Sequence, residues 1–256
     1  MNPDIAACAG IVQKGDPDRF LAIMSGPVAL REKLFPLYAM NVEVARAPWV
    51  TQESMIAEMR LQWWRDALDE IATGGQVRRH EVVTPLASIL SAEQAKALDE
   101  LVLARRWDIY KDPFEDAAQF HAHLEKTSGL LLSVAWQLAG GSPEADVSAI
   151  GYADGLARWF QAIPALEASG RLPLVDGRAE AVASLATEAL AGLAKARRLL
   201  GRVSSTEAAA LRTTWLAEPV LRQVSLSPTC VADGTIHISD FRKKSSLLWK
   251  SLNASW

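Results

Sequence analysis

The chain has 256 residues, of which 50% are hydrophobic, and a formal net charge of −3. This size suffices for one large hydrophobic core or two smaller ones, while the weak negative charge gives no electrostatic basis for nucleic-acid binding. Two cysteines, Cys8 and Cys230, are too few for a disulfide framework. No uncharged apolar run approaches the ~20 residues that span a bilayer, and the start of the chain does not resemble a signal peptide. We therefore expect a cytoplasmic protein, with peripheral contact to the inner membrane as the alternative.

Helix signals recur along the whole chain. In chain order, capping residues predict helices that start at Asn2, Asp16, Thr51, Ser91, Asp112, Ser142 and Ser204. Pro48 disfavours helix in the residue before it, so the helix that precedes it should end near Ala47. The alternating run Thr235–Ser239 is isolated, and one strand cannot form a sheet. These signals predict an all-α, single-domain protein of about eight to ten helices.

The end of the chain combines basic and apolar residues. Residues 242–244 read Arg-Lys-Lys and residues 247–249 read Leu-Leu-Trp. We expect a helical domain over residues 1–224, followed by a looser tail over residues 225–256 that carries a short basic amphipathic helix. Contact between this helix and a membrane surface or a partner is the alternative to a purely structural role.

Four short segments carry a resemblance to a known family. Leu37-Tyr38-Ala39 is followed by Asn41-Val42-Glu43, while Gly151-Tyr152-Ala153 precedes Gly170-Arg171-Leu172-Pro173-Leu174. Together they resemble the squalene/phytoene synthase family. The resemblance implies an isoprenoid-synthase-like helical bundle around a central cavity. It also implies head-to-head condensation of prenyl diphosphates, in which Mg²⁺ held by two aspartate-rich motifs stabilises the departing diphosphate.

The positions that match both aspartate motifs hold other residues. The ungapped match places the first aspartate pair at Ala45 and Trp49 and the second pair at Ala162 and Leu166. Two residues four apart share one helix face, so each lost pair removes half of a metal clamp. We therefore predict no catalytic residue, no metal site and no cofactor, and interpret the chain as a pseudoenzyme.

An active prenyl-diphosphate transferase, condensing farnesyl or geranylgeranyl diphosphate, is the alternative. It would need Mg²⁺ and relocated ligands among Glu43, Asp66, Asp154 and Glu167. Helical geometry disfavours this arrangement, because Glu43 lies about 200° around the helix from position 45 and Glu167 about 100° from the required face.

The stretch Met59–Ile71, together with Asn41–Ala45, limits the resemblance to one branch of the family. It is similar to the branch of the family that contains the mitochondrial complex I assembly factor and its bacterial relatives. The similarity covers about Asp18 to Leu174. It implies a non-catalytic assembly or lipid-binding factor, with subunits or assembly factors of respiratory complex I as protein partners.

Helical spacing within residues 51–74 predicts which side chains are buried. The expected core face consists of Ile56, Met59, Trp63, Ala67 and Ile71. On the adjoining faces, Arg60 is placed to stack on Trp64, and Arg65 is placed to form a surface ion pair with Asp69.

Eight residues are candidates for lining the cavity or binding an anion: Tyr38, Asn41, Arg46, Arg60, Trp64, Arg158, Gln161 and Arg171. We expect Arg46, Arg60 and Arg171 to converge at the cavity mouth. There they would bind an anionic lipid or an isoprenoid diphosphate without metal. Three aromatic residues are expected to fill the cavity: Trp49, Trp159 and Phe160.

Overall fold

The computed structural model describes residues 2–51 and 53–256, and every regular element within these ranges is helical. The α-helices are α1 (Pro3–Gly15), α2 (Pro17–Met24), α3 (Val28–Arg46), α4 (Ser54–Thr73), α5 (Val83–Ala87), α6 (Ala92–Ala104), α7 (Trp107–Tyr110), α8 (Ala117–Leu124), α9 (Leu130–Leu138), α10 (Ser148–Ala168), α11 (Ala179–Leu200), α12 (Ser205–Leu211), α13 (Ala217–Leu226), α14 (Thr229–Ala232) and α15 (Asp240–Leu252). A π-helical turn, η1 (Glu125–Gly129), joins α8 to α9, and a 3-10 helix, η2 (Arg212–Thr214), follows α12. The predicted all-α fold is confirmed.

Several helix ends lie where local sequence predicts them. Asn2 and Asp16 cap α1 and α2 through their side chains, and Ser91 and Ser204 form capping boxes at the starts of α6 and α12. Helix α3 ends at Arg46, with Ala47 as its C-cap, two residues before Pro48. These ends depend on neighbouring residues alone, so the sequence determines them.

Other predicted helix starts are wrong. The hydroxyl of Thr51 accepts from the amide of Glu53 at 3.1 Å, and α4 begins only at Ser54. The cap of α8 is Asp116, which accepts from the amide of Gln119, rather than Asp112. Helix α10 likewise begins at Ser148, six residues after the predicted cap Ser142. All three predicted caps stand in the loops that lead to the helices, and two of them, Thr51 and Ser142, accept from the amide two residues further on.

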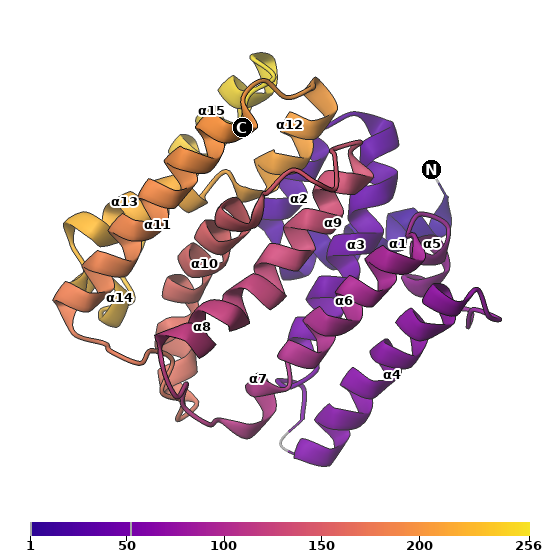
Figure 1. Cartoon of the computed structure of the whole chain (residues 1–256), viewed down its shortest axis with the longest axis horizontal. Coiled ribbons are helices and arrows are strands. Elements are labelled where there is room, and N and C mark those ends of the chain that lie inside the picture. The colour runs from indigo at the N-terminus through magenta and orange to yellow at the C-terminus, as the bar shows by residue number, and fades with distance from the viewer. Residues whose placement is uncertain (1, 52) are drawn as a thin grey trace.

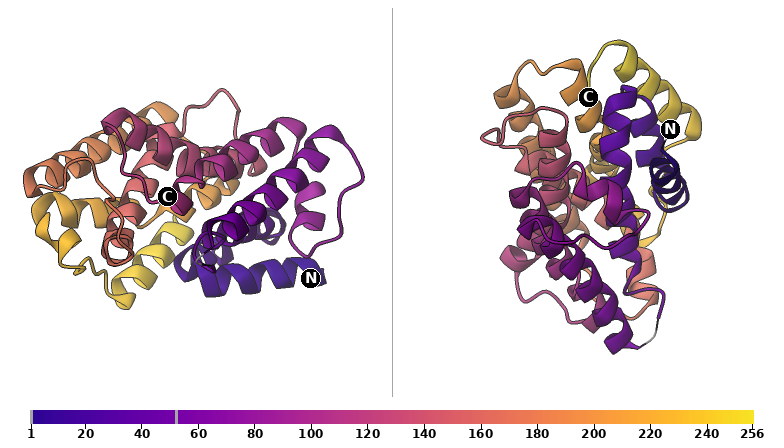
Figure 2. Two further views of the ribbon diagram at one scale, coloured as in Figure 1. Left: turned by 90° about the horizontal axis from the view of Figure 1, so that it is seen from below. Right: turned by 90° about the vertical axis from the view of Figure 1, so that its right-hand side faces the viewer.

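The long helices form a bundle with two hydrophobic cores. In Figure 1, α4, α6, α9, α10 and α11 run roughly along one diagonal of the molecule. One core is built mainly from α1, α3, α4, α6 and α9, and the other mainly from α8, α10, α11 and α13. Both views of Figure 2 place α1 and α15 along the same side of the bundle. Among the described residues, no helix is both long enough and apolar enough to cross a membrane.

The buried face of α4 differs from the predicted one. Ala67 is buried as expected, and Trp63 and Ile71 are partly buried against the first core. Met59, however, is 66% exposed and Ile56 is also exposed, whereas Leu61 and Trp64 are buried. Helix α4 lies at the edge of the bundle beside α6 (Figure 1), so a single face of it is covered. Helix α4 has more apolar residues than its covered face can bury. Residue spacing alone did not predict which of them are buried.

The last part of the chain packs on the second core. The expected domain boundary at residue 225 lies within α13, which runs to Leu226. The run Thr235–Ser239 has neither helical nor strand structure. Beyond α13, Cys230, Ile238 and Leu247 are buried in this core, and Leu247 is the one buried residue of α15.

Candidate functional site

The four positions matched to the aspartate motifs meet around one hollow. Ala45 at the end of α3 and Trp49 just after it face Ala162 and Leu166 of α10 across a hollow of about 190 Å³. The remaining lining residues are Arg19, Asn41, Arg105, Asp108, Leu124, Thr127, Ser128, Leu131, Gly155, Arg158 and Trp159. Positions separated by more than 100 residues in sequence are thus brought together as the resemblance predicts.

Two glycines allow α10 to approach η1 closely. A Cβ atom at Gly151 would lie 2.7 Å from the Cα of Gly129, and one at Gly155 would lie 2.8 Å from the Cβ of Ser128. Both contacts are made with the π-helical turn η1. π-Helical turns are rare and often occur at functional sites. The small residues therefore set the position of α10, which carries Trp159 and Ala162 into the lining.

An ion-pair cluster of two aspartates and two arginines adjoins the hollow, and its arginines, Arg19 and Arg158, line it. Arg19 Nη2 donates to Asp154 Oδ2 at 2.6 Å, and Arg158 Nε donates to the same oxygen at 3.0 Å. Asp16 Oδ2 lies 3.0 Å from Arg158 Nη1 and 3.3 Å from Arg19 Nη1. Each carboxylate therefore contacts both guanidinium groups, and the cluster is neutral overall.

The pKa values of Asp16 and Arg158 are shifted toward the charged forms. Burial alone would raise the pKa of Asp16, but Arg158 and Arg19 lie close enough to hold it below its usual value. Burial lowers the pKa of Arg158, yet Asp154 and Asp16 more than offset this effect, so its pKa is raised. All of these charges are mutually compensated, so the cluster presents no surplus negative charge to the hollow.

Three polar atoms at the hollow are buried without a hydrogen-bond partner among the described residues. They are Asn41 Oδ1, Arg19 Nε and Arg105 Nε. Buried polar atoms usually have partners, so this wall suits water molecules or a small polar ligand. With a volume of about 190 Å³, the hollow is smaller than the ~300–1,000 Å³ typical of sites for drug-sized ligands.

An aromatic cluster packs against Trp159, which lines the hollow. The ring of Trp107 stacks on Phe114 at 4.5 Å between centroids and lies 5.3 Å from Trp159. His123 packs against the same rings, and burial together with the charge of Arg105 lowers the pKa of His123 to about 3. His123 is therefore a neutral packing residue at physiological pH.

Trp49 lines both this hollow, which we name the inner hollow, and a second hollow of about 350 Å³ nearer the surface, which we name the outer hollow. Its side chain therefore separates the two. The guanidinium carbon of Arg171 lies 4.8 Å from the ring centroid of Trp49, and Arg171 donates to the backbone oxygen of Asp108. Trp49 is 46% exposed and Trp159 is buried, and both line the inner hollow, while Phe160 is buried in the second core. The predicted filling thus involves two of the three aromatic residues.

The predicted convergence of three arginines is wrong. Arg46 is exposed beside Glu43, with 3.3 Å between the charged atoms, and lines a hollow formed with α1. Arg60 lines a different hollow that also contains Trp64, and Arg171 lines the outer hollow behind Trp49. Because Arg46 follows Ala45 directly, it points about 100° away from the cavity side of α3.

Of the remaining residues that were predicted to line the cavity, some line the hollow and others lie elsewhere. Asn41 and Arg158 line the hollow, and Tyr38 lies beneath it, where its hydroxyl is 2.8 Å from Thr213 Oγ1 and Arg19 covers its ring. Gln161 is exposed on α10. The predicted stacking of Arg60 on Trp64 is replaced by contacts of Trp64 with Trp63 and His80.

The four carboxylates that relocated metal binding would need lie in separate places. Glu43 pairs with Arg46, and Asp66 accepts from Gln62 in the groove between α4 and α6. Asp154 belongs to the ion-pair cluster, and Glu167 is exposed on α10. Within residues 2–51 and 53–256, no three His, Cys, Asp or Glu side chains are grouped so that they could hold a metal ion.

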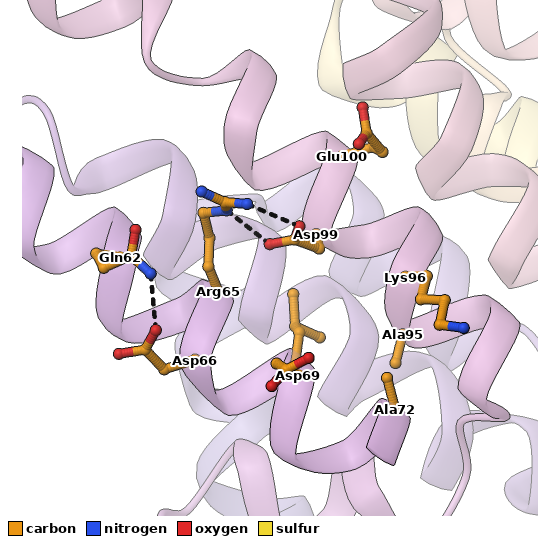
Figure 3. Close-up of a pocket in the computed structure, with 10 residues that line it drawn as sticks. Gln62, Arg65, Asp66, Asp69, Ala72, Ala95, Lys96, Asp99 and Glu100 are labelled. Atoms are coloured by element: carbon orange, nitrogen blue, oxygen red, sulfur yellow. Dashed lines mark hydrogen bonds and ion pairs between the residues drawn. The ribbon is translucent and has the colours of Figure 1, made fainter.

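The groove between α4 and α6 has a larger volume than the inner hollow, but its lining is mostly charged. Figure 3 shows its charged lining, in which Arg65 donates two hydrogen bonds to Asp99, at 2.8 and 3.1 Å. The predicted partner of Arg65 was Asp69; that prediction is wrong, because α6 supplies a carboxylate with better geometry. This ion pair holds the two helices together, and the groove, of about 540 Å³, runs along the protein surface.

Comparison with known proteins agrees with this geometry. The sequence pattern of squalene/phytoene synthases matches residues 12–176. A Drosophila melanogaster protein named as a homolog of NADH dehydrogenase (ubiquinone) complex I, assembly factor 6, is 28% identical over 166 residues, which cover 61% of this chain and 50% of that protein. The Bos taurus and Homo sapiens proteins of that name are 25% and 26% identical over 61% of this chain and 48% of their own lengths. The chain thus spans about half the length of the curated relatives it matches.

Two solved structures share the fold. A dehydrosqualene synthase in complex with ligand superimposes with a TM-score of 0.80 and 15% identity, covering 98% of this chain and 95% of that one. The squalene synthase HpnC from Alicyclobacillus acidocaldarius gives a TM-score of 0.73 at 16% identity, covering 88% and 94%. At these identities the likeness concerns the fold alone.

Proposed function

Because the chain belongs to the squalene/phytoene synthase family, we propose that it is a member that works without prenyl transfer, as an assembly or lipid-binding factor. The central observation is the make-up of the hollow. Ala45, Trp49, Ala162 and Leu166 surround it, so no carboxylate stands at the positions matched to the aspartate motifs.

Magnesium ions bind oxygen ligands, mostly carboxylates, water and phosphates. The acidic groups near the hollow are already engaged, because Asp16 and Asp154 share two arginines and Asp108 lies 3.4 Å from Arg105. The donor set therefore does not fit Mg²⁺, and we assign no step to a metal.

The size and closure of the hollow also argue against a condensing enzyme. Such an enzyme must hold two prenyl chains side by side, whereas this hollow measures about 190 Å³. Trp49 closes it toward the outer hollow, with Arg171 packed on the outer side of the ring. Any ligand of the inner hollow would be small, and a longer isoprenoid or lipid would have to displace Trp49.

The partner assignment follows from the relatives. Their names describe assembly of NADH dehydrogenase complex I, and we propose subunits or assembly factors of that complex as partners of this chain. Exposed apolar side chains on α4, on α7 and on the segments that follow α3 and α10 offer a contact surface: Trp49, Val50, Met55, Ile56, Met59, Tyr110, Leu172 and Val175. A patch of this kind typically marks an interaction site. We further propose that the protein acts in the cytoplasm, peripherally at the inner membrane.

Calorimetric titration with farnesyl and geranylgeranyl diphosphate, with and without Mg²⁺, tests the absence of prenyl transfer, together with an assay for released diphosphate. We expect no Mg²⁺-dependent binding and no release. Binding without metal or release would favour the lipid-binding form of the proposal. Mg²⁺-dependent binding with release would contradict it and restore the transferase alternative.

Co-purification tests the partner separately. The full chain, affinity-purified from cells that express it, should carry complex I subunits or assembly factors. A variant with Met55→Glu and Met59→Glu should lose them, because both side chains are exposed in the apolar patch. The control variant Leu226→Glu changes an equally exposed apolar residue on α13 and should retain them. Equal recovery from all three proteins would contradict the proposed contact surface.

A further inference from the structure

Helix α15 carries an apolar stripe that points away from the rest of the protein. Phe241, Leu248, Trp249 and Leu252 are between 61% and 83% exposed, whereas Leu247 alone is buried. At about 100° per residue, positions 241, 248 and 252 fall within about 20° of one line along the helix, with Trp249 beside them. The described residues leave this stripe uncovered.

The opposite face of α15 attaches it to the bundle through polar groups. Lys243 Nζ donates to Asp18 Oδ2 at 2.8 Å, Ser251 Oγ donates to the backbone oxygen of Ser25 at 3.3 Å, and Lys250 is half-buried. A helix on the surface of a soluble domain ordinarily turns its apolar face inward. Here the arrangement is largely reversed, so packing on the bundle does not account for the stripe.

Basic residues flank the stripe. Arg242 lies about 100° to one side of Phe241 and Lys244 about 60° to the other, and both are exposed. Across α15 there are four basic residues and one acidic residue, Asp240, although the whole chain has a net charge of −3. The rest of the protein is therefore more negative than the whole, and an anionic surface would attract α15 while repelling the remainder.

From this arrangement we infer that α15 is an interfacial helix, which lies in the plane of a bilayer containing anionic lipids and inserts Phe241, Leu248, Trp249 and Leu252 among the acyl chains. Phenylalanine, leucine and tryptophan flanked by lysine and arginine are the side chains that such helices use. A protein partner would have to offer a matching pocket for each large side chain, whereas a bilayer receives a linear stripe directly.

This inference goes beyond the proposed function and does not depend on it. In Figure 1, α15 lies at the top of the molecule, whereas α7 and the N-terminal end of α4 lie at the bottom. Docking through α15 would therefore leave the outer hollow and its apolar patch facing away from the bilayer. The two surfaces can be tested separately.

Vesicle flotation of the full chain tests the inference. Binding is expected with vesicles of phosphatidylcholine and phosphatidylglycerol at low salt. It should weaken with phosphatidylcholine alone or when salt screens the charges. A variant with Phe241→Ser, Leu248→Ser and Trp249→Ser should bind at least about ten-fold more weakly, because partitioning falls exponentially with the apolar area inserted. Arg242→Glu with Lys244→Glu should weaken binding to anionic vesicles only. These residues are exposed, so each variant should keep the helical circular dichroism of the parent.

A fluorescent label tests insertion directly. Both native cysteines are buried, so a bimane group can be attached to Ser245→Cys in the middle of the stripe. Its emission should shift to the blue on anionic vesicles, whereas the same label on Ala191→Cys of α11 should not respond.

Three results would overturn the inference. The first is no binding to anionic vesicles at low salt. The second is binding that survives both α15 variants but is lost with Met55→Glu and Met59→Glu, which would assign the membrane contact to the other apolar patch. The third is a dimer in sedimentation that the serine variant dissolves, which would assign the stripe to a second copy of the chain.

Discussion

Replacing Asp154 by asparagine should destabilise the protein strongly. The carboxylate accepts hydrogen bonds from Arg19 and Arg158, and the side chains of Asp154 and Arg19 are 5% and 6% exposed. Asparagine has nearly the same shape but no charge and one acceptor fewer. The substitution would leave two arginines sharing the single carboxylate of Asp16 in a region that water hardly reaches.

The expected loss is about 3–5 kcal/mol, the range measured when one partner of a buried ion pair is removed. A domain is typically stable by about 5–15 kcal/mol, so the change would consume a large part of the total. For a chain of this size each kcal/mol corresponds to roughly 2–4 °C in Tm. The double variant Asp154→Asn with Arg19→Met should lose less than the sum of the two single changes, since both remove the same contact.

Urea unfolding followed by far-UV circular dichroism measures this loss as a lower transition midpoint at unchanged slope. The matched control is Asp176→Asn, which removes a carboxylate from the exposed pair with Arg178 and should leave the midpoint in place. If Asp154→Asn shifted the midpoint no more than the control does, the cluster would contribute nothing to stability and the reasoning would be refuted.

Three further predictions concern the surroundings of the hollow. Gly151→Ala should lower the unfolding midpoint, because its Cβ would lie 2.7 Å from the Cα of Gly129; an unchanged midpoint would mean that the helices separate at no cost. His123→Leu should flatten the pH dependence of stability. The pKa of His123 is lowered to about 3 in the folded state. The unfolded chain therefore binds a proton at this histidine more readily, and the histidine destabilises the fold as pH falls from about 6.5 toward 3, by up to about 1.4 kcal/mol per pH unit. If the variant and the parent lost stability in parallel as pH falls, this reasoning would be contradicted. Trp49→Ala should join the inner and outer hollows and increase binding of an apolar fluorescent dye, whereas equal dye binding would show that Trp49 does not separate them.

Much of the fold follows from local sequence. The capping residues at Asn2, Asp16, Ser91 and Ser204 each satisfy amides within three residues, so their effect does not depend on distant parts of the chain. The ending of α3 before Pro48 has the same local origin. Periodicity alone did not select the buried face of α4, because that choice depends on where α6 lies.

The part of the site that the sequence located came from the resemblance to the synthase family. The match to its two aspartate motifs assigned Ala45 and Ala162 to one cavity, and both residues line the inner hollow. The ion-pair partners of Arg19 and Arg65 could not be found in this way, since Asp154 and Asp99 stand 135 and 34 residues away. A capping aspartate such as Asp16 signals a helix start, and nothing local indicates its second role.

The separation between Arg19 and Asp154 has a consequence for protein synthesis. The two residues are 135 positions apart, and at ~5–20 residues per second a ribosome needs roughly 7–27 s to translate the interval. During that time α2 is already made, but its arginine has no carboxylate from α10 to meet. The ion-pair cluster therefore forms late on the ribosome, and a nascent chain that stalls before α10 lacks most of the second core and leaves Arg19 without Asp154.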